Sequence, residues 1–360
     1  MRIEWKGLNI QDRLRPTYMA ILAVLLGFIV GAVLIQASGL NALEAYSAMF
    51  LGAFSTPYKT AETLIRASPF MMAALGFAIG FKAGYWNIGV EGQLVIGTVV
   101  ALWGGITFAD LPSILLIPLI YLLGFMGAGL WSLISGFLKA KFGVNEILTT
   151  LMMNYVAFWV GHYLVHFPWD DPEVYVPQTI PIAASAELPI LVSGTRLHAG
   201  VIVGLASAFI IYIFLKKTCL GYSIRAVGFT LEGARYAGVS VFKTVMITSF
   251  LSGGIAGLGG VGEVLGAYHV ILENLTYGYG FTGIAAAMLA LSNPLGIILS
   301  SIFFGFLVTG SLYMTRGAGL TIGAIQFFIG IMILATLVSP LIGKITVRKK
   351  LKPLISSESR

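Results

Sequence analysis

Apolar runs long enough to cross a lipid bilayer recur along this chain, and they restrict its fold more than any other feature. Of the 360 residues, 58% are hydrophobic and only 10% are charged, whereas soluble domains carry about 25% charged residues. A helix that spans the hydrocarbon core needs roughly 20 apolar residues. We therefore predict an all-α integral membrane protein, with residues 1–360 forming a single membrane-spanning domain.

About ten of these runs are predicted to be transmembrane helices. They cover approximately residues 17–35, 62–81, 88–108, 113–137, 146–166, 199–215, 244–262, 280–293, 295–313 and 319–338. Ten crossings place both termini on one side, together with all but four of the 22 Lys and Arg residues. Cytoplasmic loops are enriched in these residues, so we predict cytoplasmic termini. A break inside the membrane could replace a full crossing at 62–81 or at 280–293.

Two polar stretches are predicted to lie on opposite sides of the membrane. Residues 167–198 contain five prolines, which exclude a long helix, and their acidic residues favour an extracytoplasmic loop. Residues 216–243 carry five bases and are predicted to form a cytoplasmic loop. Within it, LEGARYA (231–237) predicts a short helix, which either docks onto a soluble partner or lies on the inner leaflet, attracted by its bases.

Polar residues also occur among the apolar runs, at residues 82–97. Asn87 and Glu91 are four positions apart, so they share one face if this stretch is helical. A carboxylate inside a bilayer is costly and should face a cavity, a partner or a pathway. We therefore predict that Asn87, Glu91 and Gln93 line a substrate pathway. In the alternative, Glu91 pairs with Lys82 and holds two helices in register.

A weak internal repeat relates residues 84–97 to residues 278–291. Each copy has an aromatic-rich glycine turn followed by a G-x-x-G pair and an apolar run. The two pairs are Gly89 with Gly92 and Gly280 with Gly283, and such small residues let helices pack closely. Transporters are commonly built from two halves with the pathway between them, so we predict two pseudo-repeats.

Motifs for catalysis are not found in the sequence. It contains no phosphate-binding G-x-x-x-x-G-K-[ST] loop, so any ATP that powers transport is bound by a partner chain. GLGGVG (257–262) lies in an apolar run, which favours helix packing over dinucleotide binding. His162 and His166 are one helical turn apart, but no acidic residue is near them in sequence, so we favour interfacial placement over a metal pair. We predict no enzyme activity, no cofactor and no metal.

Several segments together resemble the permease subunits of ABC importers in the ribose and branched-chain amino acid group, most closely those of nucleoside importers. The matching segments are NIGVEGQ (87–93), KAKFGVNEILTTLMMNYVA (139–157), LPILVSGTRLHAG (188–200), RAVGFTLEGARYAGV (225–239) and GFTGIAAAMLALSNPLG (280–296). NIGVEGQ and GVNEI are fairly specific to the nucleoside branch. The segments occur in order across most of the chain.

This resemblance implies a type II ABC importer fold in the cytoplasmic membrane and several protein partners. These are a cytoplasmic ATP-binding subunit, an extracytoplasmic substrate-binding protein and a second permease subunit, which in the nucleoside branch is usually a different chain. It also implies that the coupling helix near Arg225, Glu232, Arg235 and Tyr236 docks into the ATPase. A nucleoside is the expected solute. The alternatives are a permease for ribose or another simple sugar, or a self-contained secondary transporter with Glu91 as its coupling carboxylate.

Overall fold

The computed structural model describes residues 10–273, 278–321 and 323–337, and throughout this part of the chain the regular structure is helical. Pairing between extended segments is limited there to isolated bridges. The prediction of an all-α protein is therefore confirmed. The chain divides into two compact units, one formed by residues 1–52 and 310–360 and the other by residues 53–309.

The first unit contains α1 (Ile10–Ala37), most of α2 (Ala42–Phe54), the end of α12 (Pro294–Ala318) and the apolar helix Gly323–Leu337. Aromatic side chains hold these helices together. The Tyr46 hydroxyl donates a hydrogen bond to the Phe28 carbonyl oxygen at 2.6 Å. The rings of Phe28, Tyr46 and Phe328 pack with centroids 5.5 to 6.1 Å apart.

The second unit is a helical bundle in which α10 (Val241–Glu263) packs against three other helices. These are α3 (Pro57–Lys82), α4 (Val90–Thr107) and α5 (Ser113–Phe142). Glycines make the close approach possible, because a Cβ at Gly257 or Gly260 would overlap Ala128 of α5 or the Leu94 carbonyl of α4. The glycine run at 257–262 thus packs helices, as predicted. Helices α6 (Glu146–His166), α7 (Gly200–Lys217) and α11 (Tyr279–Leu289) complete the bundle.

Seven helices in the described residues are long and apolar enough to cross a membrane, so ten crossings are not confirmed. The seven are Ala20–Ala37, Pro57–Lys82, Val90–Thr107, Ser113–Phe142, Gly200–Lys217, Val241–Tyr268 and Pro294–Ala318. Helix α11 has 11 residues, about 16 Å at 1.5 Å per residue, which is roughly half the hydrocarbon thickness. The break expected near 280–293 agrees with this length. By contrast, α3 continues through Pro69 as one helix of 26 residues.

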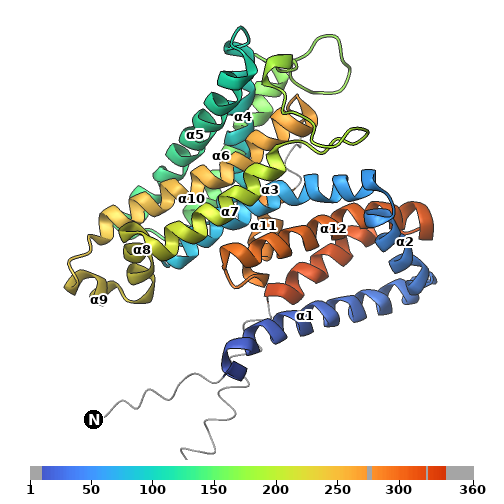
Figure 1. Ribbon diagram of the computed structural model, residues 1–360, viewed down its shortest axis with the longest axis horizontal. Helices are drawn as coiled ribbons and strands as arrows, with labels where there is room; N and C mark the ends of the chain where they lie inside the picture. Colours follow the sequence, from blue (N-terminus) through green and yellow to red (C-terminus); the bar gives the residue numbers. More distant parts are fainter. Residues whose placement is uncertain (1–9, 274–277, 322, 338–360) are drawn as a thin grey trace, which may run out of the picture. The chain divides into compact units, whose positions relative to one another are not determined.

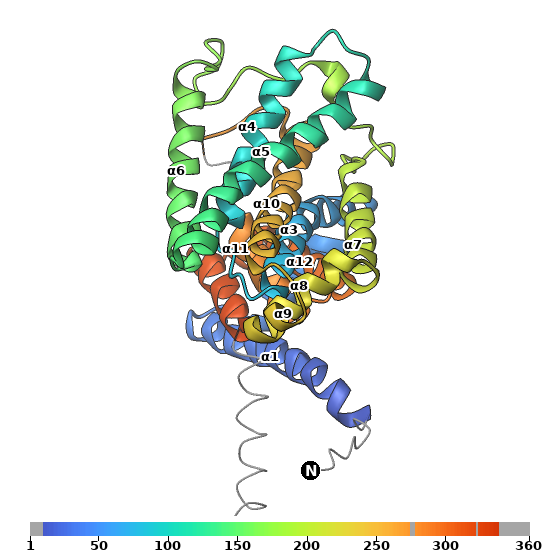
Figure 2. The ribbon, with the colours of Figure 1, turned by 90° about the vertical axis from the view of Figure 1, so that its left-hand side faces the viewer.

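The two long polar stretches lie at opposite ends of the second unit (Figures 1 and 2). At one end, residues 167–199 fold back onto the end of α10, where the π-helical turn η2 (Val264–Tyr268) follows. The backbone N–H of Ile182 donates to the His269 carbonyl at 3.0 Å, and that of Leu188 donates to the Leu265 carbonyl at 2.8 Å. At the other end lie α8 (Cys219–Phe229) and α9 (Leu231–Tyr236). Loops that lie on opposite sides of a membrane must be at opposite ends of the bundle, and these two stretches meet that requirement.

Candidate functional site

A fully buried hydrogen-bond network surrounds the turn before α4. The Asn87 amide nitrogen donates to Gln93 Oε1 and to Ser252 Oγ, both at 2.8 Å. The Gln93 amide nitrogen donates to Asn87 Oδ1 at 3.0 Å and to Ser132 Oγ at 3.1 Å. Ser252 in turn donates to the Gly76 carbonyl at 2.6 Å. The network therefore joins α3, α4, α5 and α10, and its low-dielectric surroundings strengthen each of these bonds.

Asn87 and Glu91 do not share a helical face, which corrects the expectation from their spacing. Helix α4 begins at Val90, so Asn87 lies in the preceding turn. Its Oδ1 accepts a hydrogen bond from the Gly89 N–H at 3.0 Å. An Asn side chain that bonds the backbone two residues on favours a turn over a helix. The two side chains therefore reach different neighbours.

Glu91 caps the N-terminus of α11 from the first turn of α4. Its Oε1 accepts a hydrogen bond from the Gly278 N–H at 3.1 Å, and its Oε2 accepts one from the Gly280 N–H. The first N–H groups of a helix lack partners within the helix, and a negative charge there is favoured by the helix dipole. Gly280 lies so close to α4 that a Cβ would be 2.5 Å from the Glu91 nitrogen. The carboxylate thus fixes α11 against α4.

Two side chains of α6 hold the same turn from its other side, and sequence reasoning missed both. Asn154 Oδ1 accepts from the Gly92 N–H at 2.8 Å, and its amide nitrogen donates to the Ile88 carbonyl at 3.0 Å. Thr150 Oγ1 accepts from the Ile88 N–H at 3.2 Å. The signal available in the sequence is a lone Asn within the apolar run 146–166. Its buried amide needs partners.

The four glycines predicted to pack helices are all closely surrounded. A Cβ at Gly89 would be 3.0 Å from Asn87 Oδ1, and one at Gly92 would be 2.8 Å from the Asn154 Cα. At Gly283 it would be 2.5 Å from the Ala73 Cβ of α3. Together with Gly280, these positions place α4 against α6 and α11 against α3 and α4. They explain how polar groups on separate helices meet.

A cavity of about 430 Å³ lies between α4, α6, α11 and the segment 271–273. Its lining is largely apolar and aromatic, with a few polar groups, and includes Glu91, Tyr155, Trp159, His162 and Phe281. A concave, mostly apolar site with a few placed polar groups is typical of small-molecule binding. Of the three residues predicted to line a pathway, only Glu91 belongs to this cavity wall.

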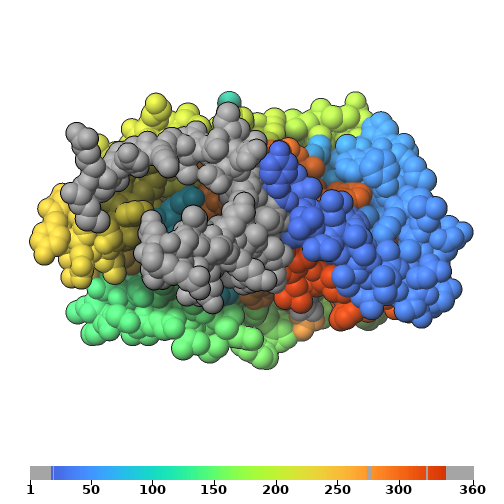
Figure 3. All heavy atoms as spheres, turned by 90° about the horizontal axis from the view of Figure 1, so that it is seen from below, coloured from blue at the N-terminus to red at the C-terminus, as the bar shows by residue number. Residues whose placement is uncertain are grey.

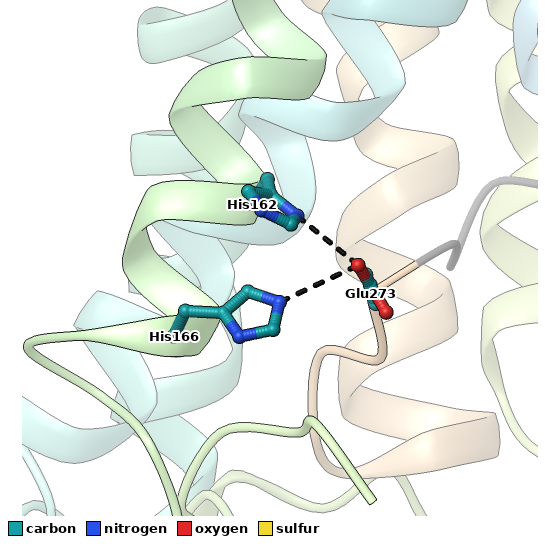
Figure 4. Close-up of side chains that lie close together, drawn as sticks. All are labelled: His162, His166 and Glu273. Atoms are coloured by element: carbon teal, nitrogen blue, oxygen red, sulfur yellow. Dashed lines mark ion pairs between the residues drawn. The ribbon is translucent and has the colours of Figure 1, made fainter.

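Two histidines and a carboxylate meet at the edge of this cavity (Figure 4). His162 Nδ1 and His166 Nε2 lie 3.2 and 3.4 Å from the same oxygen of Glu273, Oε1. The two histidines are on the last turns of α6, and Glu273 lies between η2 and α11. The expectation that the histidine pair has no acidic third ligand is therefore wrong, because Glu273 lies beside both imidazoles. Folding brings the third group from a distant segment.

The residues predicted to contact an ATPase lie on the exposed end formed by α8 and α9. Arg225, Glu232 and Arg235 are exposed, as is Tyr236 with 94% of its surface accessible. Phe229, at the end of α8, is 91% exposed. This end appears in yellow at the left of the space-filling view in Figure 3. Exposed aromatic side chains among charges are typical of protein interaction surfaces.

The chain matches a known family of transport proteins across most of its length. Residues 59–337 match the family described as the permease component of the branched-chain amino acid transport system, and the chain belongs to this family. Membership confirms the predicted resemblance to transport permeases and the prediction that the chain is not itself an enzyme. Together with the seven long apolar helices, it identifies a multi-pass membrane protein.

Three curated relatives show how close this similarity is. The guanosine ABC transporter permease protein NupP of Bacillus subtilis is 36% identical over 326 residues, which cover 89% of this chain and 93% of NupP. The nucleoside ABC transporter permease protein NupB of Lactococcus lactis is 30% identical, covering 91% and 94%. A glucose ABC transporter permease of Haloferax volcanii is 31% identical, covering 90% and 89%. No solved structure matches the chain.

Proposed function

We propose that this chain is a permease subunit of an ATP-driven importer that carries a nucleoside across the cytoplasmic membrane, with both termini in the cytoplasm. The observation that carries this proposal is the aromatic cavity beside Glu91 in a chain that belongs to a permease family. The names of the relatives NupP and NupB support a nucleoside over other solutes.

The cavity wall offers the two kinds of contact that a nucleoside needs. Tyr155, Trp159 and Phe281 present aromatic surfaces on which a nucleobase can stack. His162 and Glu273 offer polar groups for ribose hydroxyls. Release into the cytoplasm requires that such binding stays moderate.

We assign Glu91, Asn87 and Gln93 to the solute pathway, although they reach it in different conformations. Glu91 contributes to the cavity wall in this conformation. Asn87 and Gln93 are 0% and 2% exposed, so they reach the pathway only when α4 moves relative to α5 and α10 during alternating access. The two pseudo-repeats that this motion requires remain a prediction.

Three partners complete the proposed importer. An ATP-binding subunit docks on α8 and α9, a substrate-binding protein contacts residues 167–198, and a second permease, encoded as a different chain, faces this one. The exposed Arg225, Glu232, Arg235 and Tyr236 support the docking assignment. Binding of α9 to the inner leaflet is the competing explanation for its charges.

Co-purification from mild detergent tests the importer class and the docking surface together. We expect an ATPase to accompany the wild-type chain and the control Lys216→Glu/Lys217→Glu, which makes the same charge change at the end of α7. It should be absent from Arg225→Glu/Arg235→Glu, because these bases lie on the docking end. If this variant still co-purifies with the ATPase, the docking surface lies on another part of the chain. A chain without an ATPase in several mild detergents would contradict the importer proposal.

Uptake by the reconstituted importer distinguishes the candidate solutes and energy sources. We expect unlabelled nucleosides to compete with labelled guanosine, whereas ribose and glucose do not. Trp159→Leu should weaken uptake more than Trp159→Phe, because phenylalanine retains an aromatic surface. Competition by ribose or glucose would favour the sugar permease. Uptake that ceases when the ion gradient collapses, with ATP still present, would favour the secondary transporter.

A further inference from the structure

The group formed by His162, His166 and Glu273 has the composition of a transition-metal site. Two neutral imidazoles and one carboxylate form a common ligand set for zinc, with water or another ligand in the fourth position. Each of the three residues offers one ligand atom, and these atoms all lie within 4.8 Å of one another. Figure 4 shows the three side chains converging on one point from α6 and from the segment before α11.

The distances agree with ligands that share one ion. Zinc binds imidazole nitrogen and carboxylate oxygen at about 2.0–2.2 Å, so tetrahedral geometry separates neighbouring ligand atoms by about 3.3 Å. The observed separations from Glu273 Oε1 are 3.2 Å to His162 Nδ1 and 3.4 Å to His166 Nε2. The two histidine nitrogens lie within 4.8 Å of each other.

A buried ring nitrogen of His166 supports the binding of a metal ion at this site. Its Nε2 atom is buried and makes no hydrogen bond to the described residues, and its one polar contact among them is Glu273 Oε1 at 3.4 Å, although a buried polar atom normally has a hydrogen-bond partner. The His162 and His166 ring centroids are only 4.2 Å apart. An imidazole nitrogen is a common metal ligand, and two rings this close together can bind the same ion.

We propose that His162, His166 and Glu273 bind a divalent transition-metal ion, for which zinc is the probe. The ion would join the end of α6 to the segment that leads into α11. His162 and Glu273 also line the cavity, so this joint would restrain one of its walls. The side chains are 31 to 40% exposed, which leaves the site open to an ion from solution. The competing explanation is an ion pair between Glu273 and one protonated histidine.

Metal binding to the purified full-length chain tests this proposal without any transport measurement. The chain should carry a tag without histidines and the substitution Cys219→Ser, because Cys219 is an exposed thiol that can bind zinc on its own. We expect calorimetry to give one zinc ion per chain. His162→Ala, His166→Ala and Glu273→Gln should each weaken binding by at least about tenfold.

Two further variants separate a ligand role from a loss of folding. His162→Cys supplies another zinc ligand and should retain binding, whereas Glu187→Gln removes an exposed carboxylate outside the site and should change nothing. Cobalt should give the visible absorption of a tetrahedral complex with the Cys219→Ser chain but not with the His162→Ala/His166→Ala/Glu273→Gln chain. Equal zinc binding by both chains, or no zinc binding by the Cys219→Ser chain, would overturn the proposal.

Discussion

Replacing Glu91 with glutamine should loosen the start of α11 while leaving the rest of the bundle folded. The carboxylate accepts the N–H groups of Gly278 and Gly280, and its side chain has no exposed surface. Glutamine has nearly the same shape, but it is neutral and one of its two terminal groups is a donor. One amide of α11 then faces an N–H group instead of an oxygen.

The expected magnitude follows from the bonds that change. A hydrogen bond to a charged group contributes about 1.5–3 kcal/mol, and the interaction with the helix dipole adds a few tenths or more. We therefore expect the free energy of local opening at the start of α11 to fall by about 2 kcal/mol. At 1.36 kcal/mol per factor of ten, amide exchange there becomes about 30-fold faster.

Hydrogen exchange followed by mass spectrometry measures this effect in peptides that cover residues 278–289. Glu187→Gln is the matched control, because Glu187 is an exposed carboxylate in the loop 167–198. Peptides from α5 in the same samples report whether the bundle remains folded. Exchange at 278–289 that changes by less than threefold in Glu91→Gln, or equally in the control, would refute the capping argument.

Three further predictions follow from buried groups. Asn87→Ala should lower the free energy of unfolding by about 2–4 kcal/mol in detergent titrations, because Gln93 Oε1 loses the donor that Asn87 provides and the Gln93 amide nitrogen keeps only Ser132 as an acceptor. Gly280→Ala should lower the yield of folded protein, because its Cβ would overlap the backbone of Glu91. Burial, with the nearby charges of a histidine and an arginine, lowers the pKa of His198 from 6.5 to about 4. The native state therefore binds fewer protons than the unfolded chain, stability falls as pH drops through this range, and His198→Gln should reduce that fall in thermal melts.

Each of these predictions has a control and a contradicting result. Gly262→Ala is the control for the glycine, since its nearest neighbour is 3.6 Å away, and equal yields would contradict the packing argument. Asn154→Ala should lower the free energy of unfolding by a similar amount to Asn87→Ala. A free energy of unfolding that is unchanged in Asn87→Ala would show that the hydrogen-bond network is dispensable for stability. A pH dependence that persists in His198→Gln would assign the fall to another group.

Helices set by local chemistry could be predicted from the sequence. The run predicted at 113–137 becomes α5, Ser113–Phe142. The helix also includes Lys139 and Lys141 in its last turn, where positive charges are stabilised by the helix dipole. The helix then ends at Gly143, whose φ of 68° lies in the left-handed region that glycine adopts readily. Apolar composition alone underestimated the length because it excluded these charged residues.

Contacts between distant segments could not be predicted in the same way. Glu91 was singled out because a carboxylate in an apolar run is costly, but its partners at Gly278 and Gly280 are far along the chain. Glu273 reaches the histidine pair by the same kind of long-range contact. Spacing also failed at Asn87, because its side-chain bond to Gly89 favours a turn. Local patterns thus identified polar residues but not their neighbours.

The capping role of Glu91 also bears on how transport is driven. A carboxylate that couples transport to an ion gradient must bind and release that ion in every cycle. Here both of its oxygens accept backbone N–H groups at the start of α11, so protonation would weaken the acceptors at that helix start. Each cycle would then loosen α11 from α4. The ATP-driven importer proposed above needs the opposite property, a stable link between helices, and the hydrogen bonds of Glu91 link α4 to α11 in this way.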